Sequence, residues 1–299
     1  MAVITARESV VQRTAVRDRI ADLFEPAIRI WAGAAYVFLF LPIVFVIVFS
    51  FNSSRLVAVW SGFSLNWYEI AWTDHAVLEA LRTSLVVASL NAVIAVAFGT
   101  LAAVGMVRVG RRLRGVFETM VYGTIVTPEI VIAIASLLFF VTINFDLGIP
   151  TIVIAHVVYN TSIVALIVRA RLAGMDRTLE EAAQDLGATP VRTLWRVTIP
   201  LLYPAILAGG LLAFTFSFDD FVLTFFVAGA GSTTLPLLIF SMLRFGVSPV
   251  VNAIATVMLV VTLTCIFAAS AIVRRHERGE GEAGLLLTAA RSATETRAA

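Results

Sequence analysis

The chain contains six long segments that are almost free of charged residues. Each is between 21 and 27 residues long, and only the third contains a charge, that of Glu129. A helix needs about 20 mostly apolar residues to cross the hydrocarbon core of a bilayer. The sequence therefore predicts an all-α, polytopic membrane protein. Its six expected spanning helices are Trp31–Phe51, Thr83–Val107, Thr119–Phe145, Leu147–Val168, Val197–Phe218 and Pro249–Val273.

A seventh apolar stretch, Phe221–Leu243, is also uncharged. It is interrupted by a glycine- and threonine-rich sequence at 229–234 and then by Pro236. Such clusters mark turns. We therefore expect the end of the fifth helix, a loop and a short helix at the membrane interface, and the number of spans stays at six.

The basic residues indicate the orientation of the chain. All 22 are arginines, and six spans place 19 of them on the side of the two tails and three on the other side. Cytoplasmic loops carry the excess of positive charge in membrane proteins. Both termini are therefore expected in the cytoplasm, with the membrane domain at 30–274 between an N-terminal tail, 1–29, and a C-terminal tail, 275–299. We expect the C-terminal tail to be disordered because it is polar and rich in small residues. The first span starts too late and is too long to be a cleavable signal peptide.

Composition excludes several chemistries. A chain without lysine has no Walker A motif and no Schiff-base residue. Cys265 is the only cysteine, and the three histidines lack the spacing of metal ligands. The net charge is only +2, and the basic residues are divided among short loops, so no basic surface for nucleic acid is indicated. We expect neither enzymatic activity nor a cofactor or metal in this chain, so a partner must supply any ATP hydrolysis.

The loop from residue 169 to residue 200 is long and has helical signals of its own. The sequence at 178–181, Thr-Leu-Glu-Glu, is typical of a helix start, and Leu179, Ala182, Ala183 and Leu186 then form one apolar stripe. Gly187 is at the stop position, and Thr189-Pro190 starts a second helix that we expect to end before Pro200. This pattern alone leaves two readings open: a helical hairpin that packs on its own membrane domain, or a projection that a partner binds.

One motif in this loop is specific. Glu181-Ala182-Ala183, Gly187 and the sequence Val-Thr-Ile-Pro that ends at Pro200 resemble the EAA loop of the membrane subunits of bacterial ABC importers. The family pattern is Glu-Ala-Ala, three residues, Gly, nine residues and Ile-x-Leu-Pro. The two departures, Val197 and Ile199, are conservative in size and polarity.

The resemblance implies a type I ABC importer permease fold and a multi-pass protein of the bacterial inner membrane. It also implies that Glu181, Ala182, Ala183, Gly187 and Pro200 couple the chain to a separate ATPase subunit. Two ATPase copies, which bind ATP and magnesium, a second permease chain in a homo- or heterodimer, and a periplasmic solute-binding protein would complete the assembly.

A narrower resemblance lies downstream. Three sequences are similar to the spermidine/putrescine permeases of the second-subunit type: Phe-Ser-Phe-Asp-Asp-Phe at 216–221, Gly-Ser-Thr-Thr-Leu-Pro at 231–236, and the segment from Gly246 to Thr256. The similarity extends from the first span to the sixth. It implies that the solute is a polyamine. Permeases for another solute, such as an opine, thiamine or ferric ion, remain the alternative.

Three acidic residues are expected at or near membrane depth: Glu129 in mid-bilayer after Pro128, and the adjacent Asp219 and Asp220 toward the outer interface. A buried charge there costs about 2.5–3.5 kcal/mol on insertion scales and therefore indicates function. We expect these carboxylates to line the pathway of a cation, with the two adjacent aspartates about 100° apart on their helix. The alternative is that they are structural pairs.

His156 lies in the fourth span, beside Tyr159 and Asn160. We expect a satisfied hydrogen bond between helices rather than a proton relay. A proton-coupled secondary transporter would also use Glu129 and His156, but it would have no need of the motif from Glu181 to Pro200.

Overall fold

The computed structural model describes residues 25–274 except 27, 57–58, 177, 245 and 247, together with the helical backbone course of 2–24 and 275–298. In this part of the chain the regular elements are helices, and the expected all-α class is confirmed. The predicted tails, 1–29 and 275–299, lie almost entirely outside the residues whose side chains are described.

Five helices are long and apolar enough to cross a membrane, and a bent pair provides a sixth span. The five are the Ile28–Ser50 part of α1 (Ala2–Ser50), α3 (His75–Arg108), α6 (Ile149–Ala173), the continuous helix Pro190–Asp219, and the Pro249–Arg274 part of α12 (Pro249–Ala298). The six predicted spans are thus present. At the end that carries the 169–200 loop, each helix continues past its predicted boundary, whereas at the other end the first, third and fourth spans are one to three residues shorter.

The third span is broken rather than only kinked. It consists of α4 (Arg111–Val126) and α5 (Glu129–Thr142), which meet at an angle of 107°. Thr127 and Pro128 separate the two helices in an extended conformation. Proline disfavours the helical conformation in the residue before it and lacks an N–H group, so a helix ends easily at this point. Glu129 is therefore the first residue of a new helix.

The core of the membrane domain forms where α3, α6 and α9 (Ile199–Asp219) pack together. Val164 of α6 fits between two glycines: a Cβ atom on Gly99 would lie 2.7 Å from the Val164 Cβ, and one on Gly209 would lie 3.4 Å from its Cγ1. Small residues allow helix backbones to approach closely in membranes. The adjacent residues Gly209 and Gly210 therefore lie at a close helix contact.

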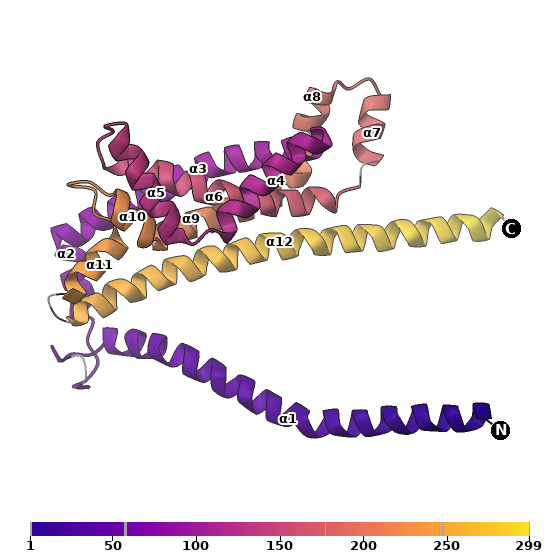
Figure 1. Ribbon diagram of the computed structural model, residues 1–299, viewed down its shortest axis with the longest axis horizontal. Helices are drawn as coiled ribbons and strands as arrows, with labels where there is room; N and C mark the ends of the chain where they lie inside the picture. Colours follow the sequence, from indigo (N-terminus) through magenta and orange to yellow (C-terminus); the bar gives the residue numbers. More distant parts are fainter. Residues whose placement is uncertain (1, 57–58, 177, 245, 247, 299) are drawn as a thin grey trace.

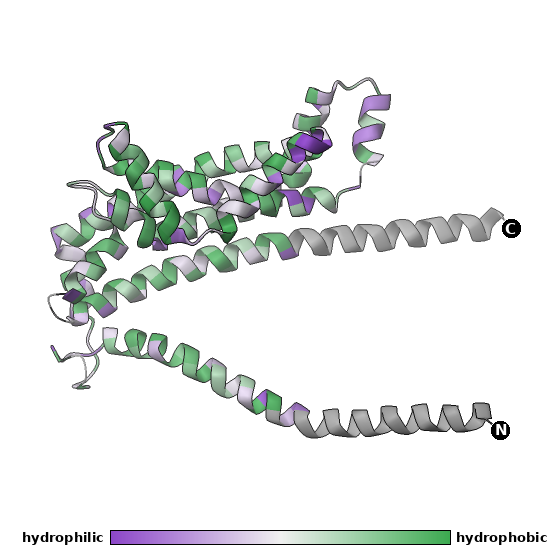
Figure 2. Ribbon diagram, in the orientation of Figure 1, coloured by the Kyte–Doolittle hydropathy of each residue, from purple (hydrophilic) through white to green (hydrophobic). Residues whose placement is uncertain are grey.

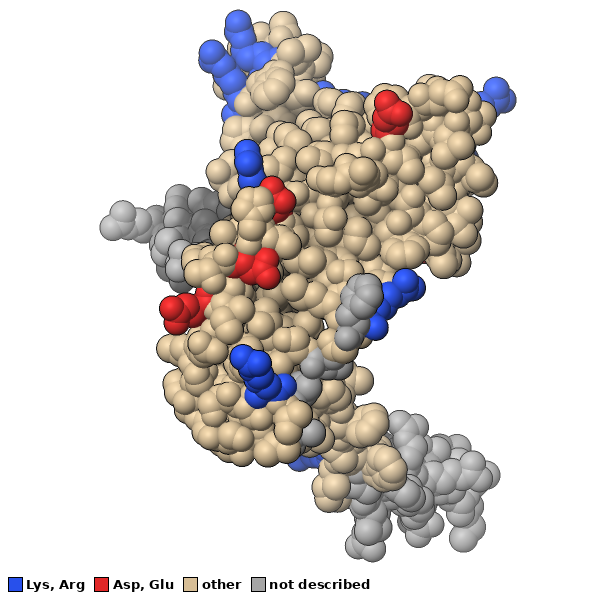
Figure 3. Space-filling view, turned by 90° about the vertical axis from the view of Figure 1, so that its left-hand side faces the viewer, with Lys and Arg blue, Asp and Glu red and all other residues tan. Residues whose placement is uncertain are grey.

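The end of the molecule opposite the 169–200 loop carries α2 (Asn66–Thr73), α10 (Val222–Val227) and α11 (Leu235–Arg244), as Figure 1 shows. The stretch predicted not to cross the membrane forms α10, a turn and α11, so that prediction is confirmed. One detail differs. The fifth spanning helix ends at Asp219, and α10 is a separate helix because Asp220 leaves the helical conformation. Figure 3 shows this end with charged side chains of both signs scattered over a mostly uncharged surface.

The other end of the molecule carries α7 (Thr178–Asp185) and α8 (Pro190–Thr193). The described ends of α1 and α12 point in the same direction (Figure 1). Hydrophilic residues gather here, on α7 and at the adjoining ends of α3 and α4 (Figure 2). This arrangement agrees with the arginine count, which assigns the loop and both termini to the cytoplasm.

A glycine in the turn between α10 and α11 supplies a test of the packing at the outer end. A Cβ atom on Gly229 would overlap the backbone carbonyl of Leu147. We expect Gly229→Ala to destabilise the protein by about 1–3 kcal/mol, because backbone atoms cannot move aside as a side chain can. The measurement is the midpoint of thermal unfolding in detergent. Gly231→Asn is the matched control, since Gly231 has open space around it and a φ of +75° that asparagine tolerates. Equal midpoints for the two variants would contradict the prediction.

Candidate functional site

The cytoplasmic loop folds as two short helices around Gly187. The N–H of Ala188 donates to the carbonyl of Ala183 (3.0 Å), and the N–H of Gly187 donates to the carbonyl of Gln184 (2.8 Å). These two bonds form a Schellman motif, which requires a left-handed residue after the helix. Gly187 supplies it with a φ of +86°. The predicted helix stop is confirmed.

The flanking signals are also present. Thr189 caps α8 by accepting a hydrogen bond from the N–H of Arg192 (3.3 Å), with Pro190 in the first turn. At the start of α7, the N–H of Thr178 donates to Oδ1 of Asp176 (2.9 Å), and this bond lowers the pKa of the Asp176 carboxyl. The Asp176 carboxylate thus accepts a hydrogen bond from a backbone N–H at the start of α7.

The predicted end of the second helix is wrong. Helix α8 continues through η1 (Leu194–Thr198), one turn of π-helix, into α9, with Pro200 in the first turn of α9. The N–H of Ile199 donates to the carbonyl of Leu194, five residues back. Pro200 has no N–H to donate, and its ring would clash with the preceding turn of a regular α-helix. The wider π turn accommodates the proline without ending the helix.

The apolar stripe of α7 lies on an exposed surface. The side chains of Leu179 and Leu186 are 51% and 90% exposed, Glu181 and Ala182 are also exposed, and Ala183 is half-buried. Among the described elements, the main packing partners of helix α7 are α8 and η1. The described residues therefore leave the leucines of the stripe largely uncovered. This geometry does not support a hairpin that buries its stripe on its own membrane domain.

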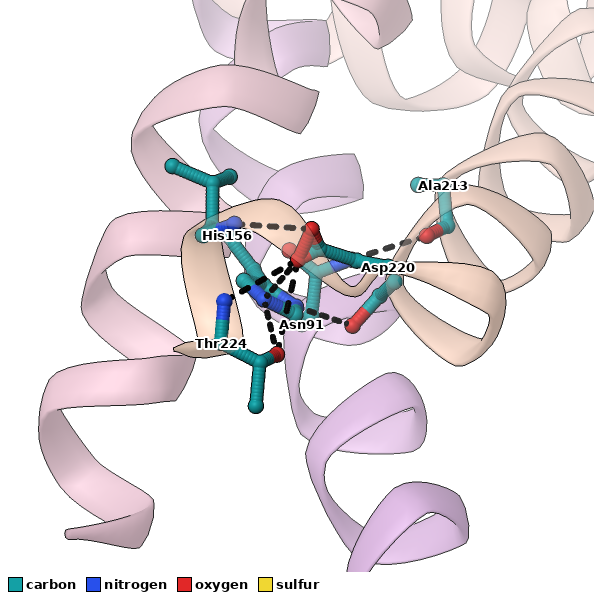
Figure 4. A network of polar contacts seen from close by, with 7 residues as sticks. Asn91, His156, Ala213, Asp220 and Thr224 are labelled. Atoms are coloured by element: carbon teal, nitrogen blue, oxygen red, sulfur yellow. Dashed lines mark hydrogen bonds and ion pairs between the residues drawn. The ribbon is translucent and has the colours of Figure 1, made fainter. Parts of the chain in front are cut away.

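A second candidate site, formed by polar side chains, lies inside the membrane domain around Asp220 (Figure 4). The Asp220 carboxylate accepts hydrogen bonds from the N–H groups of Leu223 (3.0 Å) and Thr224 (3.1 Å), at the start of α10. His156 of α6 places its Nε2 3.2 Å from Oδ2 of the same carboxylate. The two side chains are 4% and 1% exposed. A carboxylate buried this deeply needs such partners.

His156 is satisfied on both ring nitrogens. Its Nδ1 lies 2.7 Å from the hydroxyl oxygen of Ser217, and its Nε2 lies 3.2 Å from that of Thr224. The expected interhelical hydrogen bond is confirmed. Asn91 of α3 adds a further link, because its amide donates to the carbonyl of Ala213 on α9 (2.9 Å). Three residues of this network, Asn91, Ser217 and Thr224, were not predicted from the sequence, although a polar residue within an apolar run is the signal that could have found them.

Glu129 approaches the same site from the broken span. It begins α5 directly after the bend and is half-buried. Its carboxyl group lies close enough to the Asp220 carboxyl and to His156 to interact electrostatically with both. The hydroxyl of Tyr159 on α6 is close enough to interact with both carboxyl groups. The structure therefore brings together two of the three acidic residues named from the sequence.

Asp219 points elsewhere. Its two carboxylate oxygens accept from the hydroxyl of Thr262 on α12, at 2.8 and 2.7 Å, and the residue is exposed. The two aspartates thus face different helices, as the 100° spacing predicts. Thr262 lies near the middle of the Pro249–Arg274 span, so Asp219 packs beside the middle of that span. Its depth in the membrane stays a prediction.

One further acidic residue, Glu180, was missed. It accepts from the hydroxyl of Thr198, and its Oε1 lies 3.7 Å from Nη2 of Arg108. No described group of three or more histidine, cysteine or acidic residues could hold a metal ion.

The comparisons with known sequences agree with one another. The profile of the family described as "Binding-protein-dependent transport system inner membrane component" matches residues 95–280. The chain is 44% identical over 231 residues to the putrescine transport system permease protein PotI of Escherichia coli K12, covering 75% of this chain and 82% of that protein. It is 38% identical over 246 residues to the spermidine/putrescine transport system permease protein PotC of the same strain, covering 82% and 93% of the two chains.

Solved structures show the same fold. A bacterial ABC transporter involved in the import of the acidic polysaccharide alginate superimposes with a TM-score of 0.64 at 15% identity, covering 86% of this chain and 99% of that chain. The MetNI methionine ABC transporter, in an inward-facing conformation, gives 0.55 at 19% identity, covering 70% and 95%. At these identities the likeness concerns the fold alone.

Proposed function

The chain belongs to the family of binding-protein-dependent transport system inner membrane components, and from this we propose that it forms the pathway for a polyamine in an ATP-driven importer. It is a permease subunit rather than an enzyme, because a partner ATPase hydrolyses the ATP. Its relatives PotI and PotC are permeases for putrescine and for spermidine/putrescine. We propose putrescine or spermidine as the solute.

The observation that carries this proposal is the pair formed by Glu129 and Asp220 at the break of the third span. Two carboxylates that lie near each other inside a membrane repel each other unless a proton or a cation compensates their charge. An ammonium group of a polyamine has the charge and the hydrogen-bond donors that such a pair lacks. The neighbouring side chains, those of His156 and Tyr159, add polar groups around the position.

The three acidic residues would have different tasks in this pathway. Glu129 is half-buried and Asp219 is exposed, so both can be reached by a solute. The buried Asp220 carboxylate is held by His156 and by two backbone N–H groups, and it would add negative charge near Glu129. A polyamine carries several ammonium groups along a flexible chain and could contact separate carboxylates.

We further propose that the exposed face of α7 binds the ATPase subunit. Glu181, Ala182 and Ala183 would contact the partner, while Gly187 would set the turn and Pro200 the join to α9. The support is the exposure of an apolar stripe outside the membrane, because a stripe of this kind indicates a binding surface. Two ATPase copies, a second permease chain and a periplasmic solute-binding protein would complete the assembly, and ATP and magnesium would bind to the ATPase.

The proposed solute pathway is tested by removing one charge at a time. We expect Glu129→Gln and Asp219→Asn each to lower uptake of radiolabelled putrescine about tenfold, equivalent to ~1.4 kcal/mol, and Asp220→Asn to do so as well. The measurement is ATP-driven uptake into proteoliposomes that contain the assembled importer. Asp146→Asn is the matched control, since Asp146 is an exposed carboxylate in an outer loop.

Three results would contradict this proposal. Wild-type uptake in Glu129→Gln, Asp219→Asn and Asp220→Asn would exclude the carboxylates from the pathway. Uptake that follows a proton gradient and ignores ATP would favour the secondary transporter instead. Competition by unlabelled thiamine or an opine, without competition by spermidine, would indicate another solute.

A further inference from the structure

Glu180 joins α7, the helix proposed to bind the ATPase and here called the coupling helix, to the membrane domain at one point. Its Oε1 accepts the hydroxyl hydrogen of Thr198 and also lies 3.7 Å from Nη2 of Arg108. Arg108 is the last residue of α3, and Thr198 is the residue before α9. One carboxylate oxygen of α7 thus reaches the cytoplasmic ends of two core membrane helices.

The surroundings show why this link stands out. A hollow of about 310 Å³ lies between α7 and the membrane helices, lined by Val104 of α3, Leu172 of α6 and Gln184 of α7 among others. Helix α7 therefore stands away from the helices above it instead of packing on them. The Glu180 side chain is only 26% exposed and lines this hollow together with Arg108 and Thr198, whereas Glu181, the next residue, is exposed.

Thr198, one of the two partners of Glu180, lies where a movement of α7 would act on α9. Thr198 is 1% exposed and ends the π turn, where the helical hydrogen bonding is already irregular around Pro200. From there α9 runs without a break to Asp219. A helix of 21 residues is about 30 Å long. A displacement of α7 that pulls on Thr198 therefore acts on the helix whose far end leads into the acidic site.

We propose that Glu180 transmits the movement of the coupling helix to α3 and α9 through its contacts with Arg108 and Thr198. The inference rests on the proposed binding of the ATPase to α7. Glu180 acts as a positioning residue: it does not meet the solute, and its side chain faces the membrane helices rather than the exposed surface. Its removal should leave the ATPase bound but weaken the connection between ATP hydrolysis and transport.

The experiment measures binding and coupling separately in the assembled importer. The ATPase subunit is first tested for co-purification with the permease, and ATP hydrolysis and radiolabelled putrescine uptake are then measured in the same proteoliposomes. For Glu180→Ala we expect normal co-purification, continued ATP hydrolysis and at least a fivefold fall in putrescine imported per ATP hydrolysed. Thr198→Val, which removes the hydroxyl at constant shape, should cause a smaller fall in the same direction.

Two further variants make the result specific. Asp146→Asn changes an exposed carboxylate at the opposite end of the molecule and should leave the ratio unchanged. The double variant Arg108→Glu with Glu180→Arg keeps opposite charges at the two positions, and its arginine can donate to the hydroxyl oxygen of Thr198. It should recover a large part of the coupling lost in Glu180→Ala.

The outcomes separate this inference from the function on which it rests. An unchanged ratio in Glu180→Ala overturns the transmission role, and so does loss of the ATPase on purification, because Glu180 would then serve docking. Bulky replacements of Ala182 and Ala183 that leave co-purification intact would instead overturn the binding of the ATPase to α7, whatever the result for Glu180.

Discussion

Gly187→Val is expected to reduce ATP-driven uptake by tenfold or more, the largest effect that we expect on transport. The φ of +86° belongs to the left-handed region, where a β-branched residue is strained by about 1–3 kcal/mol. The chain can relieve this strain only by giving up the Schellman bonds from Gly187 and Ala188. Helix α8 would then leave α7 in another direction, and the surface proposed to bind the ATPase would be misplaced. The measurement is putrescine uptake into proteoliposomes at saturating ATP.

Two controls isolate the backbone effect at Gly187. Gly187→Asn should retain most of the uptake, because asparagine tolerates left-handed angles. Gly174→Ala, at the other end of the loop, should be close to neutral, since Gly174 has a φ of −91° and its nearest contacts are at ordinary distances. Uptake at the wild-type rate in Gly187→Val would remove the coupling role of this turn.

His156→Ala is expected to cause the largest loss of stability, about 3–5 kcal/mol. The change deletes the contact between His156 and the buried Asp220 carboxylate, and interactions with a buried charge contribute about 1.5–3 kcal/mol. The lost ring creates a cavity between α6, α9 and α10, which adds about 1–2 kcal/mol. It also leaves the hydroxyl of Ser217 without its partner on the histidine ring. The measurement is the midpoint of thermal unfolding in detergent, read together with the yield of folded protein.

The same substitution elsewhere supplies the control. His75 is 86% exposed and forms a surface pair with Glu79 at 3.6 Å, and such pairs contribute about 0–1 kcal/mol. His75→Ala should therefore unfold at the wild-type midpoint. His156→Gln, which keeps an amide donor and acceptor, should lie between the two. Equal midpoints for His156→Ala and His75→Ala would show that the polar site is not a structural element of the fold.

Much of the fold is predictable because its causes are local. The length of an uncharged run decides whether a helix can span the bilayer, and the arginines on either side decide its direction. The same holds for the turn at Gly187, where the stop signal, the Thr189 cap and Pro190 lie within a few residues of one another. No distant contact is needed to read them.

The two prolines show the limit of local reading. Pro128 and Pro200 are both visible as helix breakers, yet the chain bends by 107° at the first and continues through a π turn at the second. The difference depends on the surrounding helices. The half-helix α5 after Pro128 packs against α10, whereas Pro200 lies at the base of α9, which is held against α3 and α6.

For this protein, then, the residues themselves determined the six spans, the orientation, the coupling motif and the presence of Glu129, Asp219 and Asp220. Only the tertiary structure decided that Asp220 is held by His156 and lies beside Glu129, that Asp219 faces Thr262, and that Glu180 rather than Glu181 reaches Arg108 and Thr198. The reason is physical. Hydrophobic length and helix signals act over neighbouring residues, whereas the partner of a buried charge is whichever group helix packing brings within about 3 Å, however far away it lies in the chain.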